Sequence, residues 1–304
     1  MFVKKDALGR LFLRPWTGLY AARSLRPTWM WEGRVTQEQL PRWRCGECTL
    51  ITLLFLITPT LATATSTSCP DTPIDEISQV RYIHDGDTLH LVDGRKIRLI
   101  GINTPELARD NKPAEPFANK STKALKSLFK KDKSIALIFG KDKKDRYGRF
   151  LAHAFLADGT NVQTTILKQG LASAISIPPN TRFTACYLEN ERFARCNKAG
   201  LWASNTIIEA RNLQKKHIGF HLIKGTVKSI KTNRGGTWLT LNNRLTIGIR
   251  PKEQDLFDLQ TINKLLNQTI IVRGWLNKSS KSTPFYLRVR HPLSIQLASS
   301  YACH

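Results

Sequence analysis

The sequence is 304 residues long, which at about 150 residues per domain predicts two folded domains. Apolar residues make up 41% of it and aromatic residues 9%, so wholesale disorder and collagen-like structure are excluded. Lys and Arg total 47 against 23 Asp and Glu, a formal net charge of +24. This excess favours a polyanionic partner, with nucleic acid first and an anionic membrane or polysaccharide as alternatives.

Residues 1–64 have the pattern of an N-terminal extension that ends in a signal peptide. The strongly apolar run, Leu50 to Ile57, is far shorter than the ~20 residues that cross a bilayer. Two basic residues, Arg42 and Arg44, precede it, and Ala62-Thr63-Ala64 has the small-x-small pattern that a signal peptidase cuts. We therefore expect cleavage after Ala64 and a periplasmic or secreted protein.

Two alternatives to this leader remain open. The segment before the apolar run is long, so translation could begin at Met30. The run could also stay uncleaved and anchor the protein in a membrane, facing the periplasm. Only in that second case do we expect a membrane partner.

Export would make the cysteines candidates for disulfides. Cys45 and Cys48 would leave with the signal peptide, whereas Cys69, Cys186, Cys196 and Cys303 would remain. Cys186 and Cys196 are expected on one helix, about 15 Å apart, beyond the ~7 Å that a disulfide allows. Each should pair elsewhere, with Cys69 and Cys303 as the available partners. Free buried thiols are the alternative.

Residues 77–204 have the pattern of a mixed α+β domain. Apolar alternation and turn residues predict a β-meander, and apolar residues at helical spacing predict three helices. The expected strands are 78–82, 88–91, 96–102, 134–139 and 149–156, the last two linked by the charged stretch 141–146. The expected helices are 116–130, 162–169 and 184–198. The domain should therefore combine five strands with three helices.

The remainder of the chain predicts a second, smaller domain. Residues 205–217 are polar and linker-like, and the pattern over 218–298 is rich in strands again. Leu245, Ile247 and Ile249 alternate, and Gly and Asn residues punctuate the segment. We expect a small OB-like β-barrel over 218–298, with a short helix near 254–266.

Three motifs carry candidate chemistry. Asp85-Gly86-Asp87-Thr88 opens a strand, and carboxylates two residues apart on a tight turn can converge on a hard cation. Alone, this motif is more often a capped turn. It is followed by Arg98-Leu-Ile-Gly-Ile-Asn103-Thr104-Pro105-Glu106, and some forty residues later by Asp145-Arg146-Tyr147-Gly148-Arg149.

Together, in this order and near these spacings, the motifs resemble those of the thermonuclease family, the staphylococcal-nuclease-like phosphodiesterases. The resemblance covers residues 77–204 and ends in Gly200-Leu201-Trp202, which matches the segment after the family's last helix. It implies a five-stranded OB-type barrel with three helices, in agreement with the element pattern. A looser resemblance links 218–298 to the OB-type accessory domains of some exported nucleases.

The family resemblance implies a role for each matching residue. Asp87 matches the carboxylate ligand of a calcium ion, and Thr104 the residue whose backbone carbonyl also binds that ion. Glu106 matches the general base, which takes a proton from the attacking water. Arg98 and Arg149 match two arginines that clamp the phosphate, where their charge offsets the charge of the pentavalent transition state. Attack would break the bond to the 5′ oxygen and leave 3′-phosphates.

Two departures from the family pattern qualify these expectations. Asn103 stands where many members carry a second aspartate for the metal, which removes one negative charge near the ion and should lower metal affinity. Residues 173–179 lack the tyrosines that the best-known members place against the nucleotide base. Base preference is therefore not implied.

Further residues are candidates for binding nucleic acid. Cations near the active site add sequence-independent affinity for phosphates, and aromatic rings among cations suit stacking on unpaired bases. The candidates are Lys143, Lys144 and Tyr147 in the first domain, and Trp238, Trp275, Arg288 and Arg290 in the second. Core positions for the two tryptophans are the alternative.

The sequence thus predicts an exported, calcium-dependent nuclease that acts on DNA, RNA or both, with no stable protein partner. The first alternative is a catalytically impaired nucleic-acid-binding protein with two OB-type barrels, which Asn103 and the second barrel favour. The second is a membrane-anchored scaffold that holds acidic polysaccharide or phospholipid, which requires the apolar run to persist.

Overall fold

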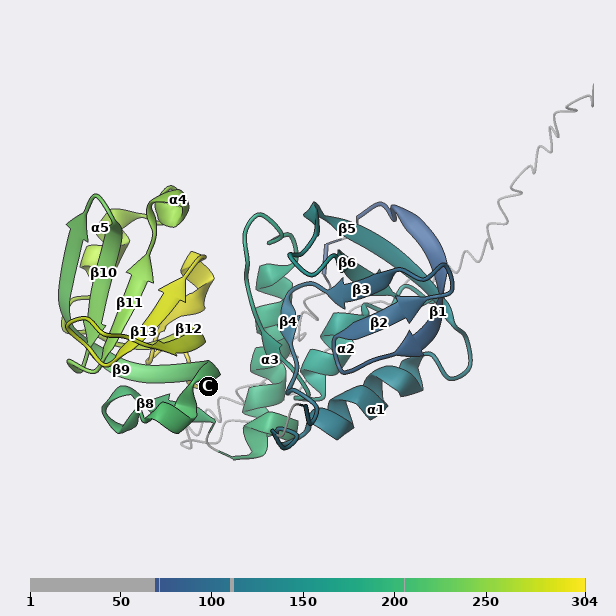
Figure 1. The fold of residues 1–304 in the computed structure, drawn as a ribbon, viewed down its shortest axis with the longest axis horizontal. Coiled ribbons are helices and arrows are strands. Elements are labelled where there is room, and N and C mark those ends of the chain that lie inside the picture. Colours follow the sequence, from purple (N-terminus) through teal and green to yellow (C-terminus); the bar gives the residue numbers. More distant parts are fainter. Residues whose placement is uncertain (1–68, 71, 110–111, 205, 304) are drawn as a thin grey trace, which may run out of the picture. The chain divides into compact units, whose positions relative to one another are not determined.

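The computed structural model describes residues 69–70, 72–109, 112–204 and 206–303 (Figure 1). All of these belong to one compact unit, Thr63–His304. The expected N-terminal extension and signal peptide, with Cys45, Cys48 and the apolar run, lie outside the described residues. Within the described ranges, no helix is long and apolar enough to cross a membrane.

The first domain contains the predicted five-stranded barrel. Its strands are β1 (Glu76–Ile83), β2 (Thr88–Leu91), β3 (Lys96–Leu99), β5 (Ser134–Lys144) and β6 (Phe150–Phe155). They close in the order β1-β2-β3-β6-β5, with β3 and β6 parallel and the other pairs antiparallel. Alternation along β3 buries Ile97 and Leu99 fully and leaves Arg98 on the other side of the strand.

The expected strand 96–102 is interrupted after Leu99, because the chain turns at Gly101. Its φ is +83°, and a Cβ there would lie 2.4 Å from ring carbons of the buried Tyr187. Only glycine fits both the turn and this close approach. The chain then continues into β4 (Ile102–Asn103), which pairs with β7 (Ser173–Ala174).

Strand β5 also differs from the prediction, because residues 141–146 were expected to link two strands. Strand β5 runs on through Lys144, so most of this charged stretch is itself part of the β5–β6 hairpin. The side chains of 141–144 are exposed there. This placement carries basic residues to the tip of the barrel beside the Asp145–Arg149 turn.

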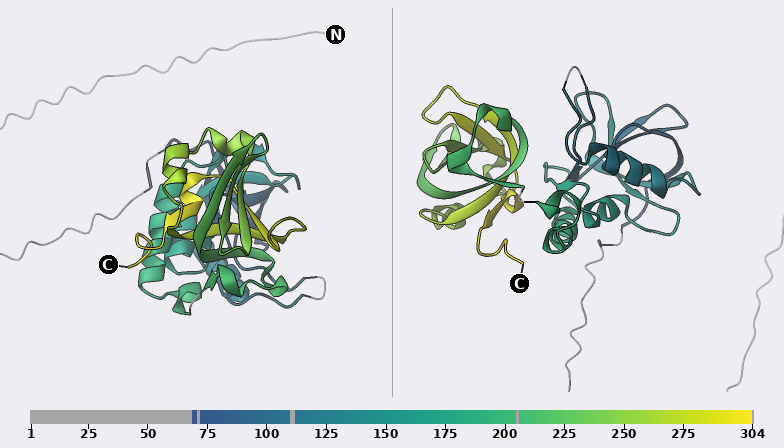
Figure 2. Two further views of the ribbon diagram at one scale, coloured as in Figure 1. Left: turned by 90° about the vertical axis from the view of Figure 1, so that its left-hand side faces the viewer. Right: turned by 90° about the horizontal axis from the view of Figure 1, so that it is seen from below.

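Three helices complete the first domain, as predicted. They are α1 (Ala118–Leu128), α2 (Val162–Lys168) and α3 (Thr184–Cys196), and α2 packs against both others (Figures 1 and 2). Helix α2 begins at Asn161, whose side-chain oxygen accepts a hydrogen bond from the Thr164 amide at 3.0 Å. After α3, a 3₁₀ turn covers Gly200–Ala203.

The second domain is also a closed five-stranded barrel. Its strands are β9 (Gly219–Asn233), β10 (Gly236–Leu241), β11 (Leu245–Ile249), β12 (Thr269–Lys278) and β13 (Phe285–Val289), with β8 (Ile207–Glu209) and β14 (Ile295–Leu297) added at the edges. The barrel order is β9-β10-β11-β13-β12, with β12 returning to β9. This is the strand order of the first barrel, so both have the OB-type topology.

Some local features of this barrel differ from the expectation. Strand β8 lies in the segment 205–217, which was expected to be a linker, and pairs in parallel with β9. Two 3₁₀ turns, Ala210–Asn212 and Lys215–His217, fill the rest of that segment, and a third covers Pro292–Ser294. Instead of one helix near 254–266 there are two, α4 (Pro251–Gln254) and α5 (Leu259–Asn263), because the Asp258 side chain caps a new helix.

Two disulfides join distant parts of the chain. Cys69 bonds to Cys186, and Cys196 bonds to Cys303. Cys186 and Cys196 both lie on α3, at its two ends. The expectation that they pair with Cys69 and Cys303 rather than with each other is confirmed.

A buried ion pair also connects helix α3 with strand β12 of the second barrel. Arg273 of β12 donates a hydrogen bond from Nη1 to Glu191 of α3 at 2.8 Å, and the two side chains are 4% and 1% exposed. The same guanidinium donates to the Ala174 carbonyl at 3.0 Å. A small buried cluster also packs residues of α3 and of the following 3₁₀ turn against β9, β12 and the C-terminal segment: Ala194, Trp202, Leu222, Ile271 and Tyr301.

Candidate active site

Two residues of the second motif, Arg98 and Thr104, converge on the carboxylate of Asp87, which directly precedes β2. Oδ2 of Asp87 accepts hydrogen bonds from the backbone amide and the hydroxyl of Thr104, at 3.1 and 3.0 Å. The same oxygen forms an ion pair with Nη2 of Arg98 at 3.0 Å. Asp87 and Thr104 are buried, so these bonds are shielded from water.

The tight turn before Asp87 has no room for a side chain. A Cβ on Gly86 would lie 2.7 Å from Cβ of Ser121 and 2.9 Å from Cβ of Thr104. The glycine therefore lets the Asp85–Asp87 turn pack directly against α1 and against the loop that carries Thr104.

The Arg98 side chain is held in place by several acceptors. Nη1 donates to the Leu99 carbonyl at 2.6 Å and Nη2 to the Ile102 carbonyl at 3.0 Å, in addition to the Asp87 pair. These bonds orient the guanidinium before any ligand arrives, which reduces the cost of placing it against an anion.

The Arg149 guanidinium reaches the same cluster from the β5–β6 hairpin. Its Nε donates to Oδ2 of Asp145 at 2.8 Å, and its Nη1 donates to the Thr88 hydroxyl at 3.4 Å. That hydroxyl donates in turn to Oδ1 of Asp87 at 3.1 Å. The two predicted arginines thus flank one carboxylate. The role of Asp145 in holding Arg149 was not predicted from the sequence. The signal was present, because Asp145 lies four residues before Arg149 and a glycine turn lies between them.

Glu106 lies close enough to this cluster for its charge to matter. The pKa of its carboxyl group is raised, first by loss of hydration and then by the negative charges of Asp87, Asp85 and Glu115. Its backbone amide donates to Oε2 of Glu115 at 3.0 Å, which fixes the loop. A raised pKa makes Glu106 a stronger proton acceptor when ionised.

The turn before β2 places two carboxylates, those of Asp85 and Asp87, close together. Asp85 lies beside Asp87, and the pKa of Asp85 is raised first by burial and then by the charge of Asp87, a repulsion that a cation would relieve. Within the part of the chain that the structure describes, no group of three or more His, Cys, Asp or Glu side chains is arranged to hold a metal. A cation here would therefore use carboxylates together with the Asn103 amide and the Thr104 carbonyl, a donor set suited to calcium or magnesium.

Asn103 and Glu106 also line a cavity of about 270 Å³ that reaches the second barrel. Trp275 and Phe220 line the same cavity, with their ring centroids 5.0 Å apart. Trp275 is 44% exposed and so is not a core residue. One of the predicted nucleic-acid-binding residues, Trp275, therefore lines the same cavity as the predicted base, Glu106.

The other predicted binding residues fall into separate places. Lys143 and Lys144 are exposed, and Tyr147 is 68% exposed, with the guanidinium of Arg149 5.5 Å from its ring centroid. Arg288 and Arg290 line a small cavity that also contains Trp275, and Arg288 forms an ion pair with the buried Glu253 at 2.5 Å. Trp238 lines a different cavity of the second barrel, so the structure does not bring the two tryptophans together.

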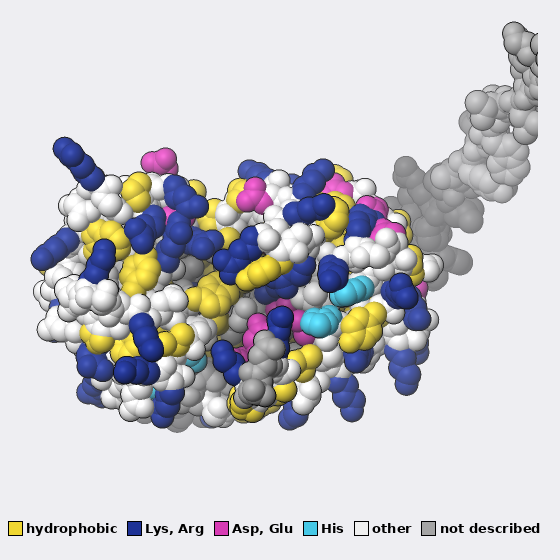
Figure 3. All heavy atoms as spheres, in the orientation of Figure 1, with side chains coloured by type: hydrophobic (Ala, Val, Ile, Leu, Met, Phe, Trp, Pro, Cys, Tyr) yellow, Lys and Arg dark blue, Asp and Glu magenta, His cyan; other side chains and the backbone are white. Residues whose placement is uncertain are grey.

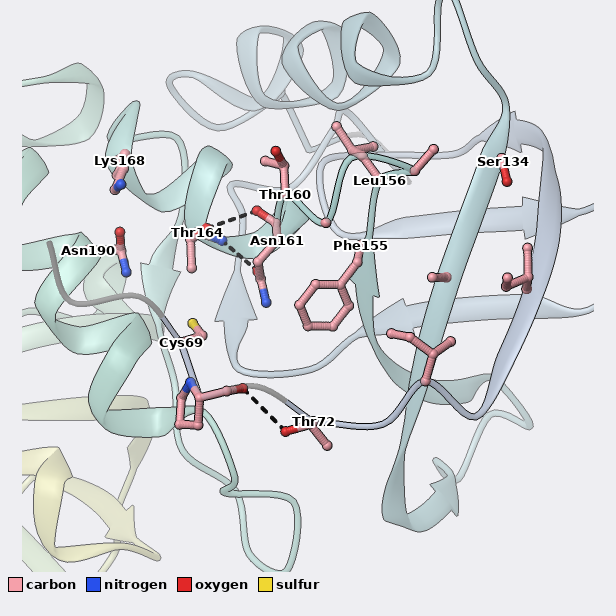
Figure 4. Close-up of a pocket in the computed structure, with 16 residues that line it drawn as sticks. Cys69, Thr72, Ser134, Phe155, Leu156, Thr160, Asn161, Thr164, Lys168 and Asn190 are labelled. Carbon is pink, nitrogen blue, oxygen red and sulfur yellow. Dashed lines mark hydrogen bonds between the residues drawn. The ribbon is translucent and has the colours of Figure 1, made fainter. Parts of the chain in front are cut away.

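The surface is rich in basic side chains and has a further cavity in the first barrel domain. Lys and Arg side chains are spread over the face shown in Figure 3, and few acidic side chains are visible on it. A cavity of about 670 Å³ lies beside Cys69, with Phe155 and Asn161 in its lining (Figure 4). It contains none of the predicted site residues.

Comparison with known proteins identifies relatives of the first domain. The family model described as staphylococcal nuclease homologue matches residues 96–204, which contain Arg98, Glu106 and Arg149. The thermonuclease of Staphylococcus intermedius is 33% identical over 130 residues, 40% of this chain and 74% of that protein. An uncharacterised endonuclease of Escherichia coli is 34% identical over 128 residues, 41% of this chain and 76% of that protein.

A relative longer than the Staphylococcus intermedius thermonuclease matches this chain at the same level of sequence identity. Endonuclease YncB of Bacillus subtilis (strain 168) is 33% identical over 132 residues, 42% of this chain. The matched segment spans 62% of the length of YncB, which is less than two thirds of that protein.

Proposed function

The chain belongs to the family of staphylococcal nuclease homologues, and from this membership we propose that it is an exported, calcium-dependent nuclease that hydrolyses phosphodiester bonds of DNA, RNA or both. The relatives whose names state an activity are a thermonuclease and endonucleases. The net charge of +24 agrees with a polyanionic substrate.

The observation that carries the proposal is the convergence on Asp87. Arg98 and Thr104 bond to its carboxylate directly, and Arg149 reaches it through the Thr88 hydroxyl. A purely structural role would not need two arginines, a buried acid and a neighbouring acid of raised pKa at one end of a barrel. Phosphodiester hydrolysis gives each of these groups a use, because it needs stabilisation of developing negative charge and a proton acceptor.

Each residue of the candidate active site would have its own role in the reaction. Asp85, Asp87, the Asn103 amide and the Thr104 carbonyl would hold calcium, which when bound neutralises charge on the phosphate. Glu106 accepts a proton from the attacking water. The guanidinium of Arg98, held by the Leu99 and Ile102 carbonyls, and that of Arg149, held by Asp145, donate hydrogen bonds to the phosphate oxygens as charge develops on them.

We also propose that the protein is exported and that residues near Arg149 contact the substrate. Disulfides such as Cys69–Cys186 persist in oxidising compartments, which agrees with the leader pattern over residues 1–64 and with a periplasmic or secreted protein. Lys143, Lys144 and Tyr147 would contact the nucleic acid beside Arg149. We propose no stable protein partner, and a membrane partner only if the leader is retained.

The test is cleavage of plasmid DNA and of RNA by the purified chain, with calcium or with a chelator. We expect cleavage with calcium, none with the chelator, and turnover reduced by at least about 10³-fold in Glu106→Gln, by analogy with other general bases and charge-stabilising groups. Glu189→Gln, which alters an exposed acid on α3, is the matched control and should leave turnover unchanged.

A second candidate function is favoured by Asn103, which leaves one carboxylate fewer near the ion than many family members have. It is a nucleic-acid-binding protein with impaired catalysis. Binding without any chelator-sensitive cleavage over millimolar calcium would support this candidate and contradict the proposed nuclease.

A further inference from the structure

We propose that the second barrel carries a groove that binds single-stranded nucleic acid and shares no lining residue with the cavity at the candidate active site. The groove is the cavity of about 890 Å³ lined by residues of β9, β10, β11 and β13 and of the segment 278–283. This proposal rests on the proposed function, from which it takes nucleic acid as the class of polyanion. It adds a second binding site and specifies that the bound nucleic acid is single-stranded.

The groove occupies a specific place in the barrel topology. Strands β10 and β11 are the second and third strands of the OB-type order, and the groove lies across residues of both. Its lining also includes residues of the turn between the first two strands, at 233–235, and of the loop between the fourth and fifth strands in chain order, at 278–283. In OB-type barrels this face and these two loops are where oligonucleotides or oligosaccharides bind.

Two aromatic rings form the floor of the groove. The centroids of Trp238 and Tyr286 lie 6.3 Å apart, with 47° between the ring planes. A Cβ on Gly248 would lie 2.8 Å from the Trp238 ring and 2.7 Å from the Tyr286 ring, so both rings lie on a surface that glycine alone leaves free. The indole Nε1 of Trp238 donates to Oδ1 of Asn233 at 3.2 Å, which orients the ring.

Cations surround these rings. The Arg250 guanidinium lies 5.3 Å from the Trp238 centroid and 5.8 Å from the Tyr286 centroid. Lys231, Lys278 and Lys281 are also part of the lining and are exposed. None of the described residues that line the groove is Asp or Glu. The groove therefore attracts a polyanion along its whole length.

The combination of rings and cations selects an unpaired strand. The faces of unpaired bases are free to stack on aromatic side chains, whereas in a duplex the bases are already stacked on each other. The phosphates of the strand would contact the lysines while one or two bases stack on Trp238 and Tyr286. A sulfated polysaccharide would use the same cations without base stacking, which makes it a useful comparison.

The experiment measures binding without catalysis. The full chain carrying Glu106→Gln, in chelator, is titrated with a fluorescently labelled thymidine oligonucleotide of about 15 nucleotides, the size of one OB-type site, and with a duplex of the same length. We expect tighter binding of the single strand and quenching of tryptophan fluorescence. Trp238→Leu should weaken single-strand binding about tenfold, Trp238→Phe should retain most of it, and Arg250→Gln should weaken it severalfold.

The controls separate stacking from charge and from misfolding. Lys264→Gln removes an exposed cation outside the groove lining and should leave the affinity within about twofold. Full affinity in Trp238→Leu and Arg250→Gln, or preferential binding of heparin with no loss in Trp238→Leu, would overturn the groove assignment. Absence of cleavage by the unsubstituted chain would contradict the proposed nuclease instead, because this binding assay does not depend on turnover.

Discussion

Asp145 holds Arg149 with both of its carboxylate oxygens. Oδ2 accepts from the Arg149 Nε at 2.8 Å, and Oδ1 accepts from the backbone amides of Arg149 and Tyr147 at 3.0 and 2.9 Å. One acidic side chain therefore sets both the shape of the turn and the direction of the guanidinium. The position of Arg149 in the candidate active site depends on a residue that does not contact Asp87.

The first prediction concerns this positioning residue. Asp145→Ala should lower kcat for DNA or RNA cleavage by about 10- to 100-fold, because displacement of a clamping group by about 1 Å costs up to that much. The control is Asp158→Ala, which removes an acid from another Asp-Gly turn that holds no arginine. Steady-state kinetics at saturating calcium measure the effect, and Asp145→Asn should recover part of it by keeping the backbone bonds. Equal rates for Asp145→Ala and the unsubstituted chain would contradict the role.

The second prediction concerns the buried pair of Glu191 and Arg273. Arg273→Met should lower the free energy of unfolding by about 3 to 5 kcal/mol, because it leaves a buried carboxylate without its counter-ion. Arg192→Met is the control, since Arg192 pairs with Glu189 at the surface and such pairs contribute at most about 1 kcal/mol. Urea unfolding followed by circular dichroism measures both. A loss in Arg273→Met no larger than that in the control would contradict the prediction.

The third prediction concerns the disulfides. Peptide mapping without reductant should find Cys69 linked to Cys186 and Cys196 linked to Cys303. The double variant Cys196→Ala, Cys303→Ala should lose about 2 to 5 kcal/mol of unfolding free energy, because its unfolded chain is no longer closed over 107 residues. A peptide that links Cys69 to Cys303 would show that this pairing is wrong.

The fourth prediction concerns acid stability and His153. This imidazole is buried and hydrogen-bonded to the Tyr187 hydroxyl at 2.8 Å, and burial, with a smaller effect of Arg182, lowers its pKa to about 3. The unfolded chain, with a histidine pKa of about 6.5, binds more protons between these values, so stability falls as pH falls from about 6.5 toward 3.

Two variants test that assignment by urea unfolding at a series of pH values. His153→Gln should reduce the slope of stability against pH between about 6 and 4, whatever its effect at neutral pH. Tyr187→Phe removes the hydrogen-bond partner but keeps the imidazole buried, so it should lower stability while retaining the slope. An unchanged slope in His153→Gln would mean that other groups cause the acid sensitivity.

The sequence predicted most of the fold because the positions of the strands and helices depend on short-range signals, whereas the roles of the candidate catalytic residues were implied by the family resemblance and stay predictions. Asp-Gly turns, alternating Leu and Ile residues and helical apolar spacing are local, and they placed the strands and helices within a few residues. Gly101 is the clearest exception. Its turn is required by the buried ring of Tyr187, which lies 86 positions later in the chain and could not be associated with it in advance.

The side-chain clusters of the second barrel depend on tertiary contacts and were not predictable in the same way. Trp238 and Trp275 both read as aromatic residues among cations, yet they lie on different strands and line different cavities. The Arg250, Trp238 and Tyr286 cluster joins residues from β10, β13 and the end of β11, which only strand order brings together. Helix spacing excluded a bond between Cys186 and Cys196, but the choice between Cys69 and Cys303 for each of them needed the structure.

The Cys196–Cys303 bond has a further consequence for the integrity of the polypeptide. Every loop of the second barrel lies between these two cysteines, including the exposed tip near Ser280 and Lys281. A single proteolytic nick in any of those loops would produce two fragments that remain covalently joined through sulfur. The two fragments would separate covalently only after a thiol had reduced the Cys196–Cys303 bond.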